Sequence, residues 1–235
     1  MNDSNTGIII QARMGSTRLP GKVLMNIGPK TLLGHIITRL SYNISSAATV
    51  VVATSTETAD DCIAEFCHIN NINCFRGSEH DVLDRYYKCA RDYSFNNIVR
   101  MTADNPFPDI AELDGMLSEH LANGVDYSHC FPTLPIGVGT EVFTFQALKE
   151  SWQEGALTHH REHVNEFILE HPERFITHLH NVPKTKNRPD IRLTVDTPED
   201  YDRANFIIDN CDNEYVSTEE AIALALKFEK LCEPK

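Results

Sequence analysis

Short β-branched apolar runs alternate with amphipathic stretches along the first half of the chain. Such runs are typical of buried strands, and the expected strands are Ile8–Ile10, Thr49–Thr54, Asn73–Phe75 and Asn97–Thr102. Apolar residues recur at helical spacing between them, and the expected helices are Thr31–Leu40, Thr58–Ile69, Asp81–Tyr93 and about Ile110–Asn123. Because parallel strands need crossover connections, this order predicts an α/β fold with a mostly parallel mixed sheet sandwiched by helices.

The second half of the chain has a different rhythm, beginning with residues 126–139, which are rich in proline, glycine and aromatic residues. The strands expected beyond them are Glu141–Phe145, Phe175–His180 and Ile191–Val195. The expected helices are about Phe145–Glu154, about His160–Glu170 and a final one that opens at DTPED. No repeat or linker divides the chain, so residues 1–235 are expected to form one domain, with residues 126–189 as a small excursion from the sheet.

Charge is unevenly distributed along this acidic chain. The net charge of −13 argues against binding nucleic acid through a basic surface. Between Ser4 and Thr56, however, there is no Asp or Glu, whereas this segment holds Arg13, Arg18, Lys22, Lys30 and Arg39. A purely basic segment in an acidic protein favours an anionic ligand.

Cellular location is also constrained by composition. No apolar run approaches the roughly 20 residues that span a bilayer, and the N-terminal residues lack the layout of a signal peptide. Seven cysteines without a CxxC pair indicate neither a disulfide framework nor a zinc site. These features predict a cytoplasmic protein with reduced thiols and no membrane partner.

A basic, glycine-containing loop follows the first expected strand and reads QARMGSTRLPGKVL. It differs from the P-loop GxxxxGK[ST], because five residues separate Gly15 from Gly21 and Val23 stands at the Ser/Thr position. The glycines allow backbone amides to approach an anion closely, and Arg13, Arg18 and Lys22 add charge-assisted bonds. The pattern favours phosphate binding, and a solvated surface turn is the alternative.

Two aspartates stand at the ends of expected strands, each two residues before a proline. Asp104 follows NIVRMT, and Asp196 follows IRLTV. Ligands of open α/β sheets bind beyond the carboxyl ends of strands, and paired carboxylates there suit Mg²⁺. Either residue could instead cap a helix, and Asp196 in DTPED is a good capping candidate.

The histidines raise the question of a second metal site. His159 and His163 are four residues apart, but no HExxH arrangement is present and Arg161 lies between them, which argues against zinc there. His178 and His180 are expected to face the same side of a strand, at the surface.

Several motifs together resemble a known family. IIQARMGSTRLPGKVL resembles the N-terminal signature of the CMP-sugar synthetases, especially 3-deoxy-manno-octulosonate cytidylyltransferases, and is closer still to the spore-coat polysaccharide cytidylyltransferase branch. The similarity continues through VVVATS, GSEHDVLDRYY, VRMTADNPFPD, EVFTFQAL, REHV and RLTVDTPEDY, in order along nearly the whole chain. Ala103 and Asn105 depart from the octulosonate enzymes, in which glycine and glutamate are usual at these positions.

The resemblance implies a nucleotide-diphospho-sugar transferase (GT-A-like) fold and the reaction of CTP with a sugar acid or related sugar to give a CMP-sugar and pyrophosphate. By position, the residues implied to contact CTP are Ala12, Arg13, Gly15, Ser16, Lys22 and Arg85. Asp104 and Asp196 match two Mg²⁺ ligands of the family, and Lys22, Arg13 and Asp104 would be catalytic. A homodimer is also implied, with residues 126–189 as the candidate interface or lid.

Other interpretations of these residues and of the chain's function remain open from the sequence. Arg100, Glu141, Arg161, Glu162 and His163 lie where an acceptor pocket or a dimer lid would form, or they form ion pairs between elements. A sugar-nucleotide-dependent glycosyltransferase of the same fold is an alternative, but Asp104 is followed by Asn-Pro and not by a DxD motif. A catalytically silent nucleotide-binding partner is the other alternative. The sugar itself is not identified by these residues, because acceptor pockets change within a shared fold.

Overall fold

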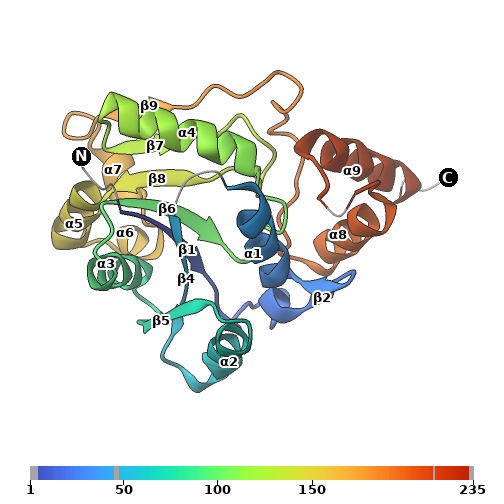
Figure 1. The fold of residues 1–235 in the computed structure, drawn as a ribbon, viewed down its shortest axis with the longest axis horizontal. Helices are drawn as coiled ribbons and strands as arrows, with labels where there is room; N and C mark the ends of the chain where they lie inside the picture. The colour runs from blue at the N-terminus through green and yellow to red at the C-terminus, as the bar shows by residue number, and fades with distance from the viewer. Residues whose placement is uncertain (1–4, 45–47, 214, 233–235) are drawn as a thin grey trace.

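A seven-stranded mixed sheet runs through the centre of the computed structural model, which describes residues 5–44, 48–213 and 215–232 (Figure 1). Its strand order is β5 (Asn73–Gly77), β4 (Ala48–Ser55), β1 (Thr6–Gln11), β6 (Asn97–Thr102), β8 (Glu141–Thr144), β7 (Tyr127–His129) and β9 (Thr177–Leu179). Strand β8 is antiparallel to both of its neighbours, and the other neighbouring pairs are parallel. The predicted mostly parallel mixed sheet is confirmed.

Helices cover both faces of the sheet because side chains of β1 alternate between them. Ile9 faces a core formed with α3 (Val82–Asp92), α5 (Phe145–Glu154) and α7 (Glu166–Glu170). Ile8 and Ile10 face the opposite core, which holds α1 (Leu32–Asn43), α2 (Asp61–Ile69) and α4 (Ile110–Asn123). This buried three-residue run therefore fixes the central strand between two helical layers (Figure 1).

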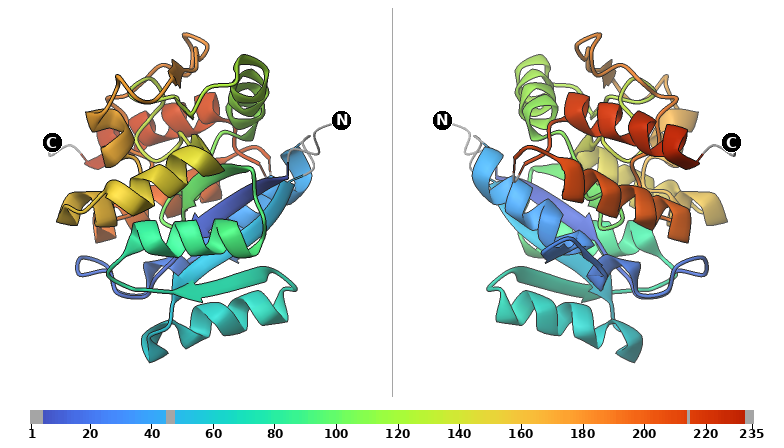
Figure 2. Two further views of the ribbon diagram at one scale, coloured as in Figure 1. Left: turned by 90° about the vertical axis from the view of Figure 1, so that its left-hand side faces the viewer. Right: turned by 90° about the vertical axis from the view of Figure 1, so that its right-hand side faces the viewer.

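A third core lies beyond one end of the strands. Helices α8 (Pro198–Asn210) and α9 (Thr218–Cys232) pack against each other there, as Figure 2 shows, together with the short strands β2 (Asn26–Ile27) and β3 (Lys30–Thr31). Helix α8 begins at Pro198 in the predicted DTPED motif and is stabilised by a capping box between Thr197 and Asp200. Helix α9 follows it, so the helix at DTPED is not the last one.

The expected strand Ile191–Val195 is wrong as a regular strand. This segment is extended and buried, but it forms one isolated bridge, between Ile136 and Arg192, and no ladder. Its backbone bonds go to Ile136 and to the carbonyl of Asp104, which receives the Val195 amide at 2.9 Å. Alternation of apolar residues here reflects packing against the third core, because Ile191, Leu193 and Val195 are all buried in it.

Two further regions differ in detail from the sequence-based expectations. The expected helix at about His160–Glu170 is two short helices, α6 (Thr158–Glu162) and α7, separated by residues 163–165. Residues 126–189 contain β7, β8 and β9, so this region extends the sheet. Residues 1–4, which argued against a signal peptide, lie outside the described residues. Within the described ranges, no helix combines the length and apolar character needed to cross a bilayer.

Candidate active site

A cleft of about 320 Å³ opens where the carboxyl ends of β1 and β6 meet the basic loop. Its far wall comes from α3 and from Glu162 and His163. The cleft is lined by every site residue predicted from the sequence: Ala12, Arg13, Gly15, Ser16, Lys22, Arg85, Asp104 and Asp196. The structure therefore brings together residues that are up to 184 positions apart in the chain, from 12 to 196.

Lys22 is the centre of this cleft. It follows Gly21, whose φ of +74° lies in the left-handed region that favours glycine, and it opens the short 3-10 helix η1 (Lys22–Leu24). Its Nζ donates to Asp104 Oδ2 at 2.8 Å, to Asp196 Oδ1 at 2.8 Å and to the Val195 carbonyl at 2.9 Å. A buried lysine with three acceptors holds both carboxylates at one point, which is the convergence that the strand-end argument predicted.

Each carboxylate is further oriented by its own neighbours. Asp104 Oδ1 accepts the Thr102 hydroxyl at 2.6 Å, whereas Asp196 pairs with Arg192 and, at 3.3 Å, with Arg18. Burial raises the pKa of Asp196, but the hydrogen bond and charge of Lys22 outweigh it and hold this pKa below its ordinary value. Asp196 is therefore ionised at neutral pH and available to a cation.

The two carboxylates suit a hard divalent cation. Both are oxygen donors of the type that Mg²⁺ binds, and both side chains remain partly exposed to the cleft, by 28% for Asp104 and 19% for Asp196. Each ionised carboxylate has more lone pairs than its present partners use. Asp104 and Asp196 therefore fit a shared cation, and in this structure their common positive partner is the Lys22 ammonium.

The basic loop is fixed by a residue that the sequence reasoning missed. Asp60, a buried residue at the end of the 3-10 helix η2 (Thr58–Asp60), accepts the Met14 amide through Oδ1 at 2.7 Å. Its Oδ2 accepts the Ser55 hydroxyl at 2.5 Å and the Ser55 amide at 3.2 Å. Asp60 thus ties the loop to the end of β4. Its only signal in the sequence is an acidic residue near a helix start, which is also typical of ordinary helix termini.

Arg13 and Arg85 supply positive charge to the same side of the cleft. Arg13 is exposed and forms no ion pair with any residue in the described part of the chain. Arg85 is buried, and its Nη1 donates to the Ser78 carbonyl at 2.5 Å. Its Nε lacks a hydrogen-bond partner among the described residues. A buried guanidinium with unused donors beside an open arginine is suited to bind an anion.

The sequence left two roles open for Arg100, Glu141, Arg161, Glu162 and His163, namely an acceptor pocket or ion pairs between elements, and the structure shows residues in each role. Arg100 Nη1 donates to Glu141 Oε2 at 2.5 Å, and Arg161 forms a two-pronged pair with Asp81 at the start of α3. These are ion pairs between elements. Arg100, Glu162 and His163 also line the cleft, so they are the members of this set that can contact a ligand.

A mixed α/β sheet with a basic loop and two carboxylates that meet at Lys22 is the arrangement expected of a nucleotidyltransferase. The chain belongs to the cytidylyltransferase family, whose model matches residues 7–224. It is 38% identical over 198 residues to the spore coat polysaccharide biosynthesis protein SpsF of Bacillus subtilis, covering 83% of this chain and 82% of that one. These findings confirm the family resemblance of the sequence motifs.

Solved structures agree with this assignment. A cytidylyltransferase from Leptospira borgpetersenii superposes with a TM-score of 0.89 at 33% identity, covering 98% of each chain. A CMP:2-keto-3-deoxy-manno-octonic acid synthetase superposes with a TM-score of 0.65 at 16% identity, covering 88% of this chain and 99% of that one. The second likeness concerns the fold alone.

Proposed function

We propose that this protein transfers CMP from CTP to a sugar acid or related sugar, with Mg²⁺, and thereby makes an activated precursor for surface polysaccharide. The observation that carries the proposal is the contact of Lys22 with Asp104 and Asp196 inside a cleft bordered by the basic loop. Three distant segments of the chain meet there, and they supply the two kinds of charge that nucleotidyl transfer needs.

The basic loop would hold the triphosphate. The exposed guanidinium of Arg13 and the loop at Gly15 line the cleft and are suited to phosphate oxygens, whereas the Ser16 amide already donates to the Met14 carbonyl at 2.9 Å. Ala12 and Arg85 also line the cleft and would contact the rest of the nucleotide. Glu162 and His163 complete its lining and would contact the acceptor sugar.

The chemistry is an in-line displacement at the α-phosphorus. The acceptor hydroxyl forms the new P–O bond, the bond from the α-phosphorus to the bridging oxygen breaks, pyrophosphate leaves, and the hydroxyl proton is released to solvent. Lys22 would neutralise charge on the phosphates, and Asp104 and Asp196 would hold Mg²⁺, which supplies further positive charge when bound. Positioning and charge neutralisation dominate such transfers.

Pyrophosphate release tests the proposal. The protein is incubated with CTP, MgCl₂ and a panel of sugar acids, and Asp104→Asn is compared with Asp202→Asn, which removes the same charge from an exposed position on α8. We expect release with CTP and one sugar class, loss of turnover in Asp104→Asn, and normal turnover in Asp202→Asn. Chelation of Mg²⁺ should abolish the reaction.

Other outcomes identify the alternatives. Near-normal turnover in Asp104→Asn refutes the role of this carboxylate. Release of UDP from a UDP-sugar without pyrophosphate indicates a glycosyltransferase, and tight nucleotide binding without any turnover indicates a silent binding partner.

We also propose that the protein is a cytoplasmic homodimer joined through residues 126–189. Exposed apolar side chains in this region support it, including Ile136, Leu157, Ile176 and Leu179. Light scattering coupled to size exclusion tests it, with Leu179→Glu expected to give the monomer. A monomeric parent protein contradicts the dimer without affecting the proposed reaction.

A further inference from the structure

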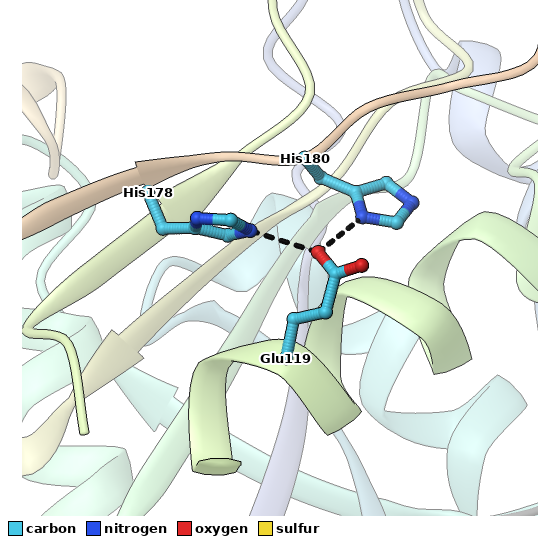
Figure 3. A group of neighbouring side chains, drawn as sticks. All are labelled: Glu119, His178 and His180. Atoms are coloured by element: carbon cyan, nitrogen blue, oxygen red, sulfur yellow. Dashed lines mark hydrogen bonds and ion pairs between the residues drawn. The ribbon is translucent and has the colours of Figure 1, made fainter. Parts of the chain in front are cut away.

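A second cluster of metal-binding residue types lies far from Lys22, between α4 and the edge strand β9. Figure 3 shows His178 and His180 turned toward the same carboxylate oxygen of Glu119. Glu119 Oε2 lies 2.8 Å from His178 Nε2 and 2.8 Å from His180 Nδ1. These ligand atoms all lie within 4.8 Å of one another. None of the three residues lines the cleft that holds Asp104 and Asp196.

The fold builds this cluster from two regular elements. His178 lies in β9 and His180 directly follows it, where its amide donates to the His129 carbonyl at 2.8 Å. Because they are two residues apart, both side chains face the same side, as expected from the sequence, and they meet Glu119 of α4 there. Their expected surface position is wrong for His180, which is buried under α4. Helix α4 accommodates its ring at Gly115, where an added Cβ would lie 3.3 Å from His180 Cε1. Glu119 stands one turn further along the same helix face.

We propose that Glu119, His178 and His180 form a binding site for a single Zn²⁺ ion, which links β9 to α4. In a tetrahedral zinc site with bonds of about 2.0–2.1 Å, neighbouring ligand atoms are roughly 3.3 Å apart. The two separations of 2.8 Å between Glu119 and the imidazoles need to open by only about half an ångström, and the two imidazole nitrogens lie within 4.8 Å of each other. Half-exposed Glu119 leaves one side of the site open to a water ligand.

The surroundings of His180 match those of a metal ligand. A histidine that binds a metal through one ring nitrogen usually donates its other N–H to a carboxylate. His180 Nε2 lies 3.1 Å from Glu112 Oε2, which leaves Nδ1 directed at Glu119. Glu112 is itself held by Lys186 at 2.8 Å. This chain of contacts orients the ring and assigns Nδ1 as the ligand atom.

Electrostatics near the cluster also favour a cation. Glu112 and Glu119 place two carboxylates around His180, against the single ammonium of Lys186. Two imidazole donors select zinc over Mg²⁺, which binds oxygen ligands.

The other His-rich cluster of the described chain makes a matched control. His159 and His160 bond different oxygens of the exposed Glu170, each at 2.7 Å. The second ring nitrogen of His160, Nδ1, lacks a hydrogen-bond partner among the described residues. This cluster therefore has the same residue types, but its buried histidine lacks the second carboxylate contact that Glu112 gives to His180.

Calorimetric titration with ZnCl₂ tests the site. The full chain is first freed of metal by a chelator and then titrated in excess MgCl₂, in the Asp104→Asn background, so that the cleft does not compete. We expect one equivalent of zinc in this protein and in His159→Ala. In His178→Ala or Glu119→Gln, the affinity for zinc should fall by more than about 10–100-fold. That is the loss expected when a residue that only supports a ligand is removed, and these variants remove a ligand itself. No zinc binding, unchanged binding in both variants, or loss in His159→Ala overturns the proposal.

Substitution with Co²⁺ gives a second readout that does not depend on activity. Cobalt in a site with imidazole ligands should show visible d–d bands, and these should disappear in His178→Ala and Glu119→Gln. Both side chains are partly exposed, by 27% and 45%, so the variants are expected to fold, and circular dichroism checks this. Bands that persist in the folded variants place the metal elsewhere and refute the site.

Discussion

The anchoring of the basic loop by Asp60 yields a quantitative prediction for Asp60→Asn. The new amide would turn its NH₂ group toward Ser55, whose hydroxyl can reverse and accept, but the Ser55 amide would then lack an acceptor. An orphaned buried donor costs about 1–3 kcal/mol, and the remaining bond to Met14 loses its charge, at about 1 kcal/mol. We therefore expect a loss of about 2–4 kcal/mol of stability.

Thermal unfolding and pyrophosphate release measure the two consequences. For a chain of this size, 1 kcal/mol shifts Tm by roughly 2–4 °C, so Tm should fall by about 4–16 °C. Displacement of the loop that carries Arg13 should lower kcat/KM by roughly 10²-fold, because catalysis is sensitive to shifts of about 1 Å.

Asp61→Asn is the matched control for this prediction. Asp61 is the next residue, its side chain is 60% exposed, and it pairs with Arg76 at 2.6 Å. Exposed pairs contribute about 0–1 kcal/mol, so this variant should keep nearly normal stability and activity. Equal stability and equal activity of the two variants would show that Asp60 does not position the loop.

Three further predictions concern charges described above. Lys22→Met should lower kcat by about 10²–10³-fold in the pyrophosphate assay while circular dichroism stays unchanged, and normal turnover would contradict its role. Glu141→Gln should cost about 3–5 kcal/mol in urea unfolding, because it leaves the buried guanidinium of Arg100 without its counter-charge; a cost below 1 kcal/mol would contradict this. Stability should also fall in acid. Burial raises the pKa of the Asp60 and Asp109 carboxyls, but their hydrogen bonds outweigh it and hold both pKa values below normal. The partners are Met14 and Ser55 for Asp60, and Lys186 and Thr218 for Asp109. The stability that these two carboxylates contribute is fully present above their pKa in the unfolded chain, about 3.9, and is lost as pH falls through their lower pKa in the folded protein. The urea midpoint should therefore decline below about pH 4, and less steeply in Asp60→Asn.

Most of the sheet could be predicted because its pattern is local. The centres of β1, β4 and β6 are runs of isoleucine or valine, and such runs have few alternatives to a buried strand. The position of Lys22 near the strand-end carboxylates also followed from general rules, since the carboxyl ends of parallel strands meet at one edge. The same rule predicted the meeting of Asp104 with Asp196, although residues 191–195 are not a strand of the sheet and reach Asp104 through the bond from the Val195 amide to its carbonyl.

The failures involve contacts between segments distant in sequence. Residues 191–195 alternate like a strand, yet this segment forms a single bridge, to Ile136 in a loop, and pairs with none of the described strands. Asp60 looks like any acidic residue at a helix start, and its bond to Met14 spans 46 positions. His180 is buried against α4, where Gly115 leaves room for its ring. Local periodicity carries no information about any of these partners.

The contact of Lys22 with Asp196 also has a consequence for the order of folding. The two residues are separated by 174 positions, and residues 191–195, which lead to Asp196, pack with α8 and α9 in the third core. Contacts of such long range form late, because the intervening chain must first be ordered. During synthesis, the central strands can assemble long before residue 196 emerges. The cleft with its complete charge set is therefore among the last features of the molecule to appear, and a chain interrupted before that point would keep much of the sheet without the site.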